Sequence, residues 1–113
     1  MHELSIAQSI VELAEREARK RQAGSIEEVE LEIGDFAGIE WFALEFALES
    51  ATKGSLLEEA RIVRQRIAGE GRCGDCENIF PVENIFSACP ICGSYAVKII
   101  KGKELRIKSI TVK

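Results

Sequence analysis

The sequence predicts an α+β fold in which two helices pack on a three-stranded sheet, with a four-cysteine ribbon inserted into the chain. Three observations support this prediction. Apolar residues recur at helical spacing in two segments, and they alternate with polar residues in three others. All four cysteines lie in two Cys-x-x-Cys pairs, which fall between the second and the third alternating segments.

The first helix is expected to begin near Ser5, which forms a capping-box pattern with Gln8, and to stop at Gly24. Residues 26–33 then alternate from Glu28 onward, with aliphatic side chains on one face and glutamates on the other. This alternation predicts a strand with one buried and one solvated face. The apolar stripe of the helix consists of Ala7, Ile10, Val11, Ala14 and Ala18.

A second helix is expected over residues 39–52, after a glycine-containing break. Its inner stripe is formed by Leu44, Ala47, Leu48 and Ala51. Three aromatic residues broaden the apolar face, and we expect them to contact the sheet rather than a ligand. They are Trp41, Phe42 and Phe46.

Residues 55–69 fit either a further helix or a strand that follows one helical turn. We favour the strand, because a lone strand at 26–33 would need partners. Residues 105–112 read as the last strand, and the alternation shifts phase between Ile107 and Ile110, which suggests a bulge. The predicted layout is therefore discontinuous.

Two domains follow from this layout. Residues 1–69 and 103–113 are expected to form the α/β domain, and residues 70–102 the ribbon domain.

The cysteine pairs predict a metal site. Each Cys-x-x-Cys step allows two thiolates to point inward from one tight turn, so two such turns supply the four sulfurs of a tetrahedral site. Structural zinc is the favoured occupant, which makes the insertion a zinc ribbon; iron and redox dithiols or disulfides are the rivals. Four closed thiolates leave no open coordination position, so a structural rather than catalytic role is expected. The four ligands are Cys73, Cys76, Cys89 and Cys92.

The segment around the cysteines gives further expectations. Gly93 follows the second pair and is expected to adopt a positive φ, and Asn78 is expected to adopt a left-handed conformation near the first pair. A module of about 30 residues buries too little surface to fold alone, so a metal is expected to hold it together. Its small core is expected to contain Ile79, Phe80, Val82, Ile85 and Phe86.

The charge distribution argues against nucleic-acid binding. The formal net charge is -4, and the charged residues between the first and last cysteine are all acidic, whereas phosphate contacts need a basic face. No apolar run approaches the ~20 residues of a membrane-spanning helix, so membrane insertion is not expected. The opening residues lack the pattern of a secretory signal, which makes a cytoplasmic location the default.

The amino terminus is a second candidate metal site. The Met1 α-amine, the His2 amide and the His2 imidazole can close fused chelate rings around one metal, and the Glu3 amide or carboxylate can complete a plane. Such a nitrogen-rich square-planar set suits Ni(II) or Cu(II). The competing interpretation is that His2 is an incidental residue of a frayed chain end. Glu40 is a further candidate ligand, although an acid at the start of a helix also complements the helix dipole.

Several of these features together resemble the HypA/HybF family of hydrogenase maturation proteins. They are the Met1-His2-Glu3 start, the Gly34 break after a glutamate-rich strand, the two Cys-x-x-Cys pairs and the Cys89-Pro-Ile-Cys92-Gly-Ser94 sequence. The similarity covers essentially the full length of the chain.

The resemblance implies a nickel metallochaperone that helps to insert Ni(II) into the large subunit of [NiFe]-hydrogenase, together with a GTPase partner. By this analogy Met1, His2 and Glu3 carry nickel, with Glu40 as an additional candidate, and the four cysteines hold structural zinc. Some relatives have histidines beside the zinc knuckles. This chain has none there.

Two other functions stay open at this point. One is a zinc-ribbon adaptor that binds protein or nucleic acid and carries no mobile metal. The other is an iron-sulfur electron carrier, which would absorb visible light and show a reversible potential. No serine or cysteine nucleophile is paired with an activating histidine, and no phosphate-binding glycine loop is present, so an enzyme is not expected.

Overall fold

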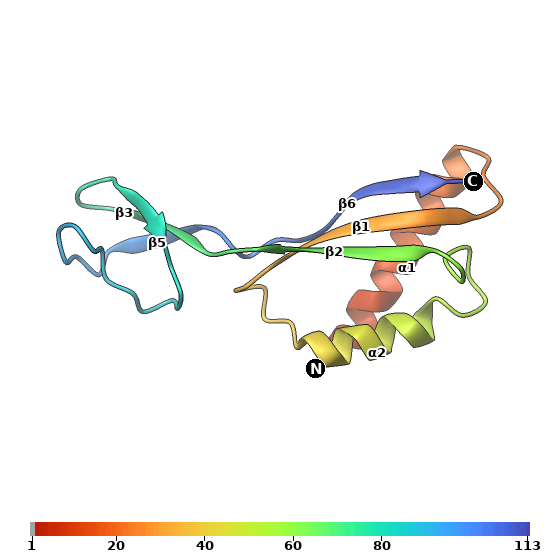
Figure 1. Cartoon of the computed structure of the whole chain (residues 1–113), viewed down its shortest axis with the longest axis horizontal. Helices are drawn as coiled ribbons and strands as arrows, with labels where there is room; N and C mark the ends of the chain where they lie inside the picture. The colour runs from red at the N-terminus through yellow and green to blue at the C-terminus, as the bar shows by residue number, and fades with distance from the viewer. Residues whose placement is uncertain (1) are drawn as a thin grey trace. The chain divides into compact units, whose positions relative to one another are not determined.

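The computed structural model describes residues 2–113, which form two compact units. Unit 1 contains the described residues up to Glu32, together with Ile39–Gln65 and Arg106–Lys113, and unit 2 contains Ile33–Gly38 and Arg66–Leu105. The elements are labelled in Figure 1 and run in the order α1 (Glu3–Lys20), β1 (Ile26–Gly34), α2 (Trp41–Ala51), β2 (Arg61–Ile67), β3 (Glu70–Cys73), β4 (Ile79–Pro81), β5 (Val97–Lys101) and β6 (Leu105–Val112).

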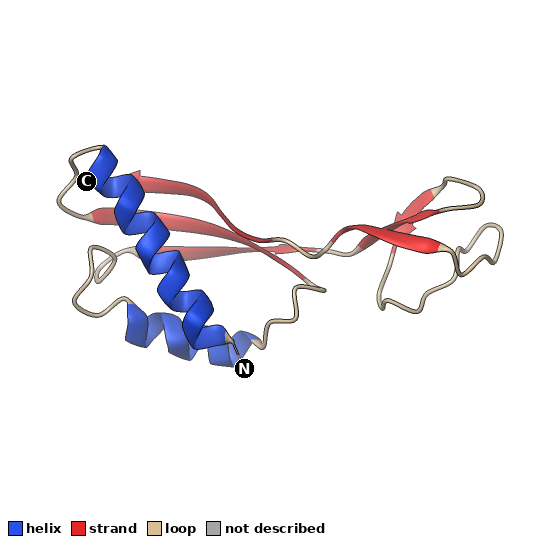
Figure 2. Ribbon diagram, turned by 180° about the vertical axis from the view of Figure 1, so that it is seen from behind, coloured by secondary structure: helices blue, strands red, loops and turns tan. Residues whose placement is uncertain are grey.

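Unit 1 contains a three-stranded sheet in the order β2-β1-β6, and both helices cover the same face of it (Figure 2). The core of unit 1 contains Val29 and Leu31 from β1, and Leu44 and Leu48 from α2. Each of these side chains is almost fully buried. The α1 stripe of Ala7, Ile10, Val11, Ala14 and Ala18 is buried as well. The predicted fold class of two helices on a three-stranded sheet is therefore confirmed.

The other face of this sheet is covered by ion pairs. Glu32 of β1 accepts a hydrogen bond from Arg106 of β6 at 2.6 Å, and Glu28 pairs with Arg61 of β2. Glu30, between them, accepts a 2.9 Å hydrogen bond from Gln65. The alternating glutamates of β1 thus meet partners on both neighbouring strands, which leaves this face charged, hydrated and paired across the strands.

The core position Leu44 allows a direct test of this packing. Replacing the fully buried Leu44 with alanine should lower the free energy of unfolding by about 2–5 kcal/mol, because it removes apolar contacts and leaves a cavity. The matched control is Phe42→Ala on the same helix, whose side chain is 86% exposed and should cost about 0.5 kcal/mol or less. Urea unfolding followed by far-ultraviolet circular dichroism would measure both, and equal effects would contradict the assigned helix face.

The ends of α1 differ from the expected ones. The helix begins at Glu3 with His2 as its N-cap, and no side chain caps it, so the capping box expected at Ser5 and Gln8 is wrong. At the other end, Gln22 takes a positive φ of 56°, and Ala23 N–H donates to the Ala18 carbonyl at 2.9 Å. This is a Schellman-type stop, which ends the helix before Gly24.

The aromatic residues of α2 also differ from the prediction. Phe42 is 86% exposed and Phe46 is 76% exposed, so the expected contact of these rings with the sheet is wrong. Trp41 is 36% exposed. The helix presents only one stripe to the core, and the smaller aliphatic side chains of Leu44, Ala47 and Leu48 occupy it. The rings lie on the other side of the helix because an α-helix can bury only one stripe in this way.

The region after α2 forms turns and then strand β2, which confirms the favoured interpretation of residues 55–69. Ser55 does not cap a helix. Its hydroxyl donates to the Thr52 carbonyl at 2.7 Å and accepts from Leu57 N–H at 3.0 Å, which stabilises the turn.

Unit 2 contains a second sheet in the order β4-β3-β5, with both pairings antiparallel. Its hydrophobic core cluster consists of Cys73, Phe80, Val82 and Cys89, against which Phe36, Cys76, Val97 and Ile99 pack. The predicted ribbon core was too large: Ile79, Ile85 and Phe86 are at least 60% exposed. A module of this size has too little interior to bury them.

Candidate metal centre

The first cysteine knuckle follows directly from β3, whose last residue is Cys73. The Glu77 amide donates to the Cys73 carbonyl at 2.9 Å, and the Cys73 amide donates to the Asn78 carbonyl at 3.0 Å. Closing this turn requires a left-handed residue. Glu77 fills that role with a φ of 64°, so the sequence prediction that Asn78 would do so is wrong by one position.

The second knuckle repeats this pattern at the same spacing. The Gly93 amide donates to the Cys89 carbonyl at 2.9 Å, and the Cys89 amide donates to the Ser94 carbonyl at 2.8 Å. Gly93 has a φ of 76°, which confirms the expected positive φ at this position. Glycine adopts this conformation without the steric cost that a side chain brings.

Hydrogen bonds join the two knuckles. The Ser94 hydroxyl donates to the Asp75 carboxylate, and it accepts from the Ala96 amide at 3.0 Å. The Gly74 amide donates to the Ala96 carbonyl at 2.7 Å. The tip of the first knuckle is therefore fixed to the chain that leaves the second, which holds the two cysteine pairs face to face.

The four sulfurs converge. All four Sγ atoms of Cys73, Cys76, Cys89 and Cys92 lie within 4.8 Å of one another. The Cys73–Cys92 and Cys76–Cys89 sulfur pairs are each 3.5 Å apart, and all four cysteines are free. A disulfide needs sulfurs about 2.05 Å apart, whereas a tetrahedron of metal-sulfur bonds of about 2.3 Å places them near 3.8 Å. The spacing therefore fits four ligands of one metal ion.

Backbone amides point at the sulfurs. The amides of Asp75 and Cys76 each lie 3.4 Å from the Cys73 sulfur. The Cys76 amide lowers the pKa of the Cys73 thiol, because an N–H donor stabilises the thiolate. In the second knuckle the amide of Cys92 lowers the pKa of Cys89 in the same way. The structure thus favours the deprotonated sulfurs that bind metal.

The side chain of Asn78 adds a donor that the sequence analysis did not identify. Its Nδ2 lies 3.2 Å from the Cys76 sulfur. The pKa of Cys76 is lowered first by the Asn78 amide and then by this side chain. A polar residue two positions after a ligand cysteine is a weak signal in sequence, because only the turn geometry brings it to the sulfur.

Cys92 behaves differently. The Ser94 amide acts to lower its pKa, but the neighbouring Cys73 sulfur, burial of the sulfur and the other cysteines raise the pKa to about 12. Negative sulfurs this close together repel one another, and a cation among them offsets that repulsion. The four cysteine sulfurs therefore suit binding of a metal cation.

The predicted amino-terminal site is distributed between the two helices of unit 1. Met1 lies outside the described residues. His2 is exposed at the N-cap of α1, whereas Glu3 is 5% exposed and its carboxylate accepts a hydrogen bond from the Glu40 amide at 3.1 Å. Glu40 is the N-cap of α2, and its own carboxylate accepts from the Ala43 amide at 2.6 Å.

The structure therefore ties the start of α1 to the start of α2 through Glu3. It also gives Glu40 a capping role at the first turn of its helix. Within residues 2–113, the four cysteines are the only group of three or more metal-binding side chains close enough to share one ion.

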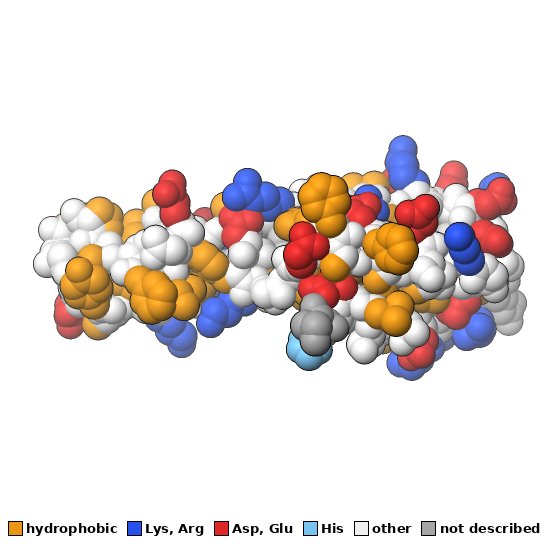
Figure 3. All heavy atoms as spheres, turned by 90° about the horizontal axis from the view of Figure 1, so that it is seen from below, with side chains coloured by type: hydrophobic (Ala, Val, Ile, Leu, Met, Phe, Trp, Pro, Cys, Tyr) orange, Lys and Arg blue, Asp and Glu red, His pale blue; other side chains and the backbone are white. Residues whose placement is uncertain are grey.

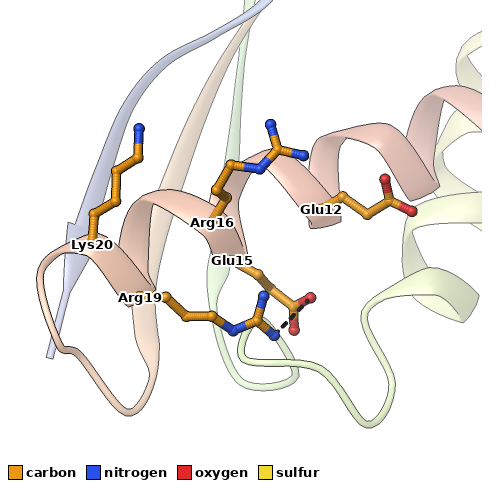
Figure 4. A pocket seen from close by; sticks show the side chains of 5 residues that line it. All are labelled: Glu12, Glu15, Arg16, Arg19 and Lys20. Carbon is orange, nitrogen blue, oxygen red and sulfur yellow. Dashed lines mark ion pairs between the residues drawn. The ribbon is translucent and has the colours of Figure 1, made fainter.

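A shallow hollow on unit 1 lies along the C-terminal half of α1 (Figure 4). Its walls are long charged side chains, and Arg19 pairs with Glu15 at 3.7 Å. The lining residues, Glu12, Glu15, Arg16, Arg19 and Lys20, include neither a nucleophile nor a histidine. The hollow shows a charged helix surface rather than a reaction centre. Among the described helices, none has the length and apolar character to cross a membrane.

The comparisons with known proteins identify the family of the chain. Residues 1–112 match the family model described as HypA, hydrogenase/urease nickel incorporation, metallochaperone. The chain is 65% identical to the hydrogenase maturation factor HypA of Parabacteroides distasonis, over all of this chain and 98% of the relative. It is 45% identical to the protein of the same name from Geobacter sulfurreducens, over 99% of each chain.

Two solved structures are similar over nearly the whole chain. The solution structure of the Ni metallochaperone HypA from Helicobacter pylori has a TM-score of 0.71 at 31% identity, covering 99% of this chain and 97% of that one. A second solution structure, of a HypA protein, has a TM-score of 0.76 at 30% identity, covering all of this chain and 97% of that one. The chain belongs to the HypA family of nickel-incorporation metallochaperones for hydrogenase maturation.

Proposed function

We propose that this protein carries Ni(II) at its amino terminus, delivers it to the large subunit of [NiFe]-hydrogenase, and uses zinc only to hold unit 2 folded. The zinc assignment is supported by the donor set, since four converging sulfurs with amide donors match a closed structural zinc site. Cys73, Cys76, Cys89 and Cys92 would hold the ion. When bound, zinc supplies a rigid tetrahedral cross-link rather than an open position for chemistry.

The nickel assignment rests on one observation above all. His2 is exposed at the start of α1, and the next residue, Glu3, is anchored to the start of α2. This anchor holds the base of the terminal Met1-His2-Glu3 segment against unit 1 while the imidazole of His2 stays accessible. A chelate of the terminal amine, the His2 amide nitrogen and the imidazole suits a square-planar Ni(II) ion.

The same arrangement suits release of the ion. Binding through an amide nitrogen and an imidazole requires deprotonated ligands, so protonation weakens the site. Glu40 is a further candidate ligand, but its carboxylate must leave the Ala43 amide to reach a metal. We propose Met1, His2 and Glu3 as the principal nickel ligands, with Glu40 in second place; Glu3 can bind through its amide nitrogen while its carboxylate keeps the hydrogen bond from the Glu40 amide.

The family membership also suggests the setting of this function. We propose that the protein acts in the cytoplasm with a hydrogenase-maturation GTPase and the hydrogenase large subunit as partners, and that it is not itself an enzyme. The division into a nickel-binding domain of residues 1–69 and 103–113 and a zinc-ribbon domain of residues 70–102 stays a prediction.

The proposal is tested by calorimetric nickel titration of the zinc-loaded protein with a free Met1. The same protein with a short Gly-Ser extension before Met1 is titrated beside it. The extension removes the free α-amine and keeps every side chain, so we expect one nickel per chain in the first protein and loss of tight binding in the second. His2→Ala should also lose tight nickel binding and retain its zinc.

The outcome that contradicts the proposal is equally specific. If both proteins bind nickel alike, or neither binds it, the terminal chelate is wrong. A protein that holds one zinc and no nickel would favour the zinc-ribbon adaptor instead.

A further inference from the structure

Unit 2 carries a surface of large apolar side chains that the metal centre does not use. Ile85 is 60% exposed, Phe86 79%, Ile91 67% and Tyr95 80%, and Ile79 is 60% exposed at the start of β4. We call these five residues the ribbon patch. Isolated exposed apolar residues are ordinary, but several within one small module mark an interaction site.

Hydrogen bonds in the loop that joins the two knuckles fix the backbone around Ile85 and Phe86. Asn84 forms a turn in which its side-chain oxygen accepts from the Phe86 amide at 2.9 Å and its carbonyl accepts from the Ser87 amide at 3.3 Å. This turn satisfies the amides of Phe86 and Ser87 within the loop. Ile85 and Phe86 are then left on the outside of the loop that joins the two knuckles.

The second knuckle presents the other part of the patch. Ile91 lies between the two cysteines of that knuckle, and its amide donates a hydrogen bond to the Cys89 sulfur at 3.4 Å. Tyr95 follows Ser94, whose hydroxyl is tied to Asp75 of the first knuckle. Figure 3 shows apolar side chains gathered on the face of unit 2 that is turned to the viewer. Hydrogen bonds of the second knuckle therefore fix the backbone on either side of Ile91 and Tyr95.

The charges beside the patch indicate its partner. The loops between Cys73 and Val97 contain Asp75, Glu77 and Glu83 and no lysine or arginine. Asp75 is bound by Ser94, and Glu77 pairs with Arg72 at 2.8 Å. Glu83 is exposed, has no ion pair within residues 2–113, and lies next to the turn that presents Ile85 and Phe86.

A second copy of this chain fits the patch poorly. A symmetric contact would bring the same acidic loops together, and like charges that face each other oppose binding. We propose that the ribbon patch docks a partner protein that presents apolar side chains beside lysine or arginine. This inference rests on the proposed function only for the choice of probes. The two probes are the purified maturation GTPase and the purified hydrogenase large-subunit precursor.

The test measures the affinity of the zinc-loaded protein for each probe by calorimetry. We expect at least one probe to bind, and the double substitution Ile85→Ser with Phe86→Ser to weaken that binding about tenfold or more. The matched control is Leu13→Ser on α1, a 50% exposed apolar residue outside unit 2, which should leave the affinity unchanged.

Two charge-reversal variants provide a second test, of whether the partner presents lysine or arginine. Glu83→Lys should weaken binding, whereas Lys98→Glu on strand β5 should not. Both residues are exposed, so neither substitution should disturb the fold, and zinc content checks this.

The inference is overturned if neither probe binds the wild-type protein or if the double variant binds both probes as tightly as the wild type does. Conversion of a wild-type dimer into a monomer by the double variant would also overturn it, in favour of a second copy as the occupant. Nickel titration of the double variant separates the two proposals, because nickel binding at the amino terminus should be unchanged when docking is lost.

Discussion

Cys89→Ser is expected to release the zinc and unfold unit 2 while unit 1 stays folded. The buried core of unit 2 consists of two ligand cysteines with Phe80 and Val82, so its apolar surface alone cannot offset the entropy of ordering the chain. In the proposed zinc-bound state, metal binding supplies the missing free energy, and the cysteine variant loses that contribution. The core of unit 1 contains no ligand cysteine and should not depend on the metal.

Zinc content after exposure to a chelator, together with a two-dimensional amide spectrum, measures this effect residue by residue. Signals from residues 66–105 should collapse to the narrow range of unfolded chains, and those of α1 and α2 should remain dispersed. The control is Ile91→Ser, which changes an exposed residue within the same knuckle and keeps all four ligands. A dispersed spectrum for unit 2 in Cys89→Ser would mean that the metal is not the main source of its stability.

Gly34→Ala is expected to destabilise the protein strongly for a substitution that adds only one methyl group. A Cβ atom at this position would lie 2.0 Å from the Gly102 carbonyl oxygen and 2.7 Å from the Lys103 amide. Both contacts are with backbone, which cannot rotate away as a side chain can. The Gly34 amide also donates to the Glu104 carbonyl at 2.7 Å, so relieving the clash would break this hydrogen bond. We expect a loss of about 3 kcal/mol in the free energy of unfolding.

Gly24→Ala is the matched control for this clash. No heavy atom lies within 4 Å of a Cβ built at Gly24, and its φ is not in the left-handed region. The substitution should change stability by about 0.5 kcal/mol or less. Urea unfolding at saturating zinc compares the two variants with the wild type. Equal urea midpoints for the two variants would show that the backbone of Gly102 and Lys103 does not lie so close to Gly34.

The close packing at Gly34 involves two further glycines of unit 2. A Cβ at Gly69 would lie 2.3 Å from the ring of Phe36, and Gly102 has a φ of 113° and lies beside Gly69. The sequence showed Gly34 only as the end of a strand and Gly102 only as a turn. Their approach joins residues far apart in the chain, which no local pattern records.

The amino-terminal segment shows the same limit. The Met-His-Glu start predicts a metal site from its ligand types, with the Glu3 amide or carboxylate as one ligand. In the structure Glu3 is buried and accepts a hydrogen bond from Glu40, 37 positions away. That role depends on how α1 packs against α2, so it was not predictable from residues 1–3.

What the sequence determined by itself was local in origin. Alternation along 26–33 identified a strand, helical spacing identified two helices, and the two Cys-x-x-Cys steps identified a four-sulfur site. Each of these patterns reflects interactions between residues a few positions apart, which the order of the chain already contains.

Only the tertiary structure decided which apolar side chains are covered. Phe42 and Phe86 are as apolar as Phe80, yet Phe80 is 6% exposed and the other two are at least 79% exposed. Burial depends on how much surface the neighbouring elements offer, and in this protein a small sheet and a small ribbon offer little. Hydrophobicity is a property of the residue, whereas burial is a property of the packing around it.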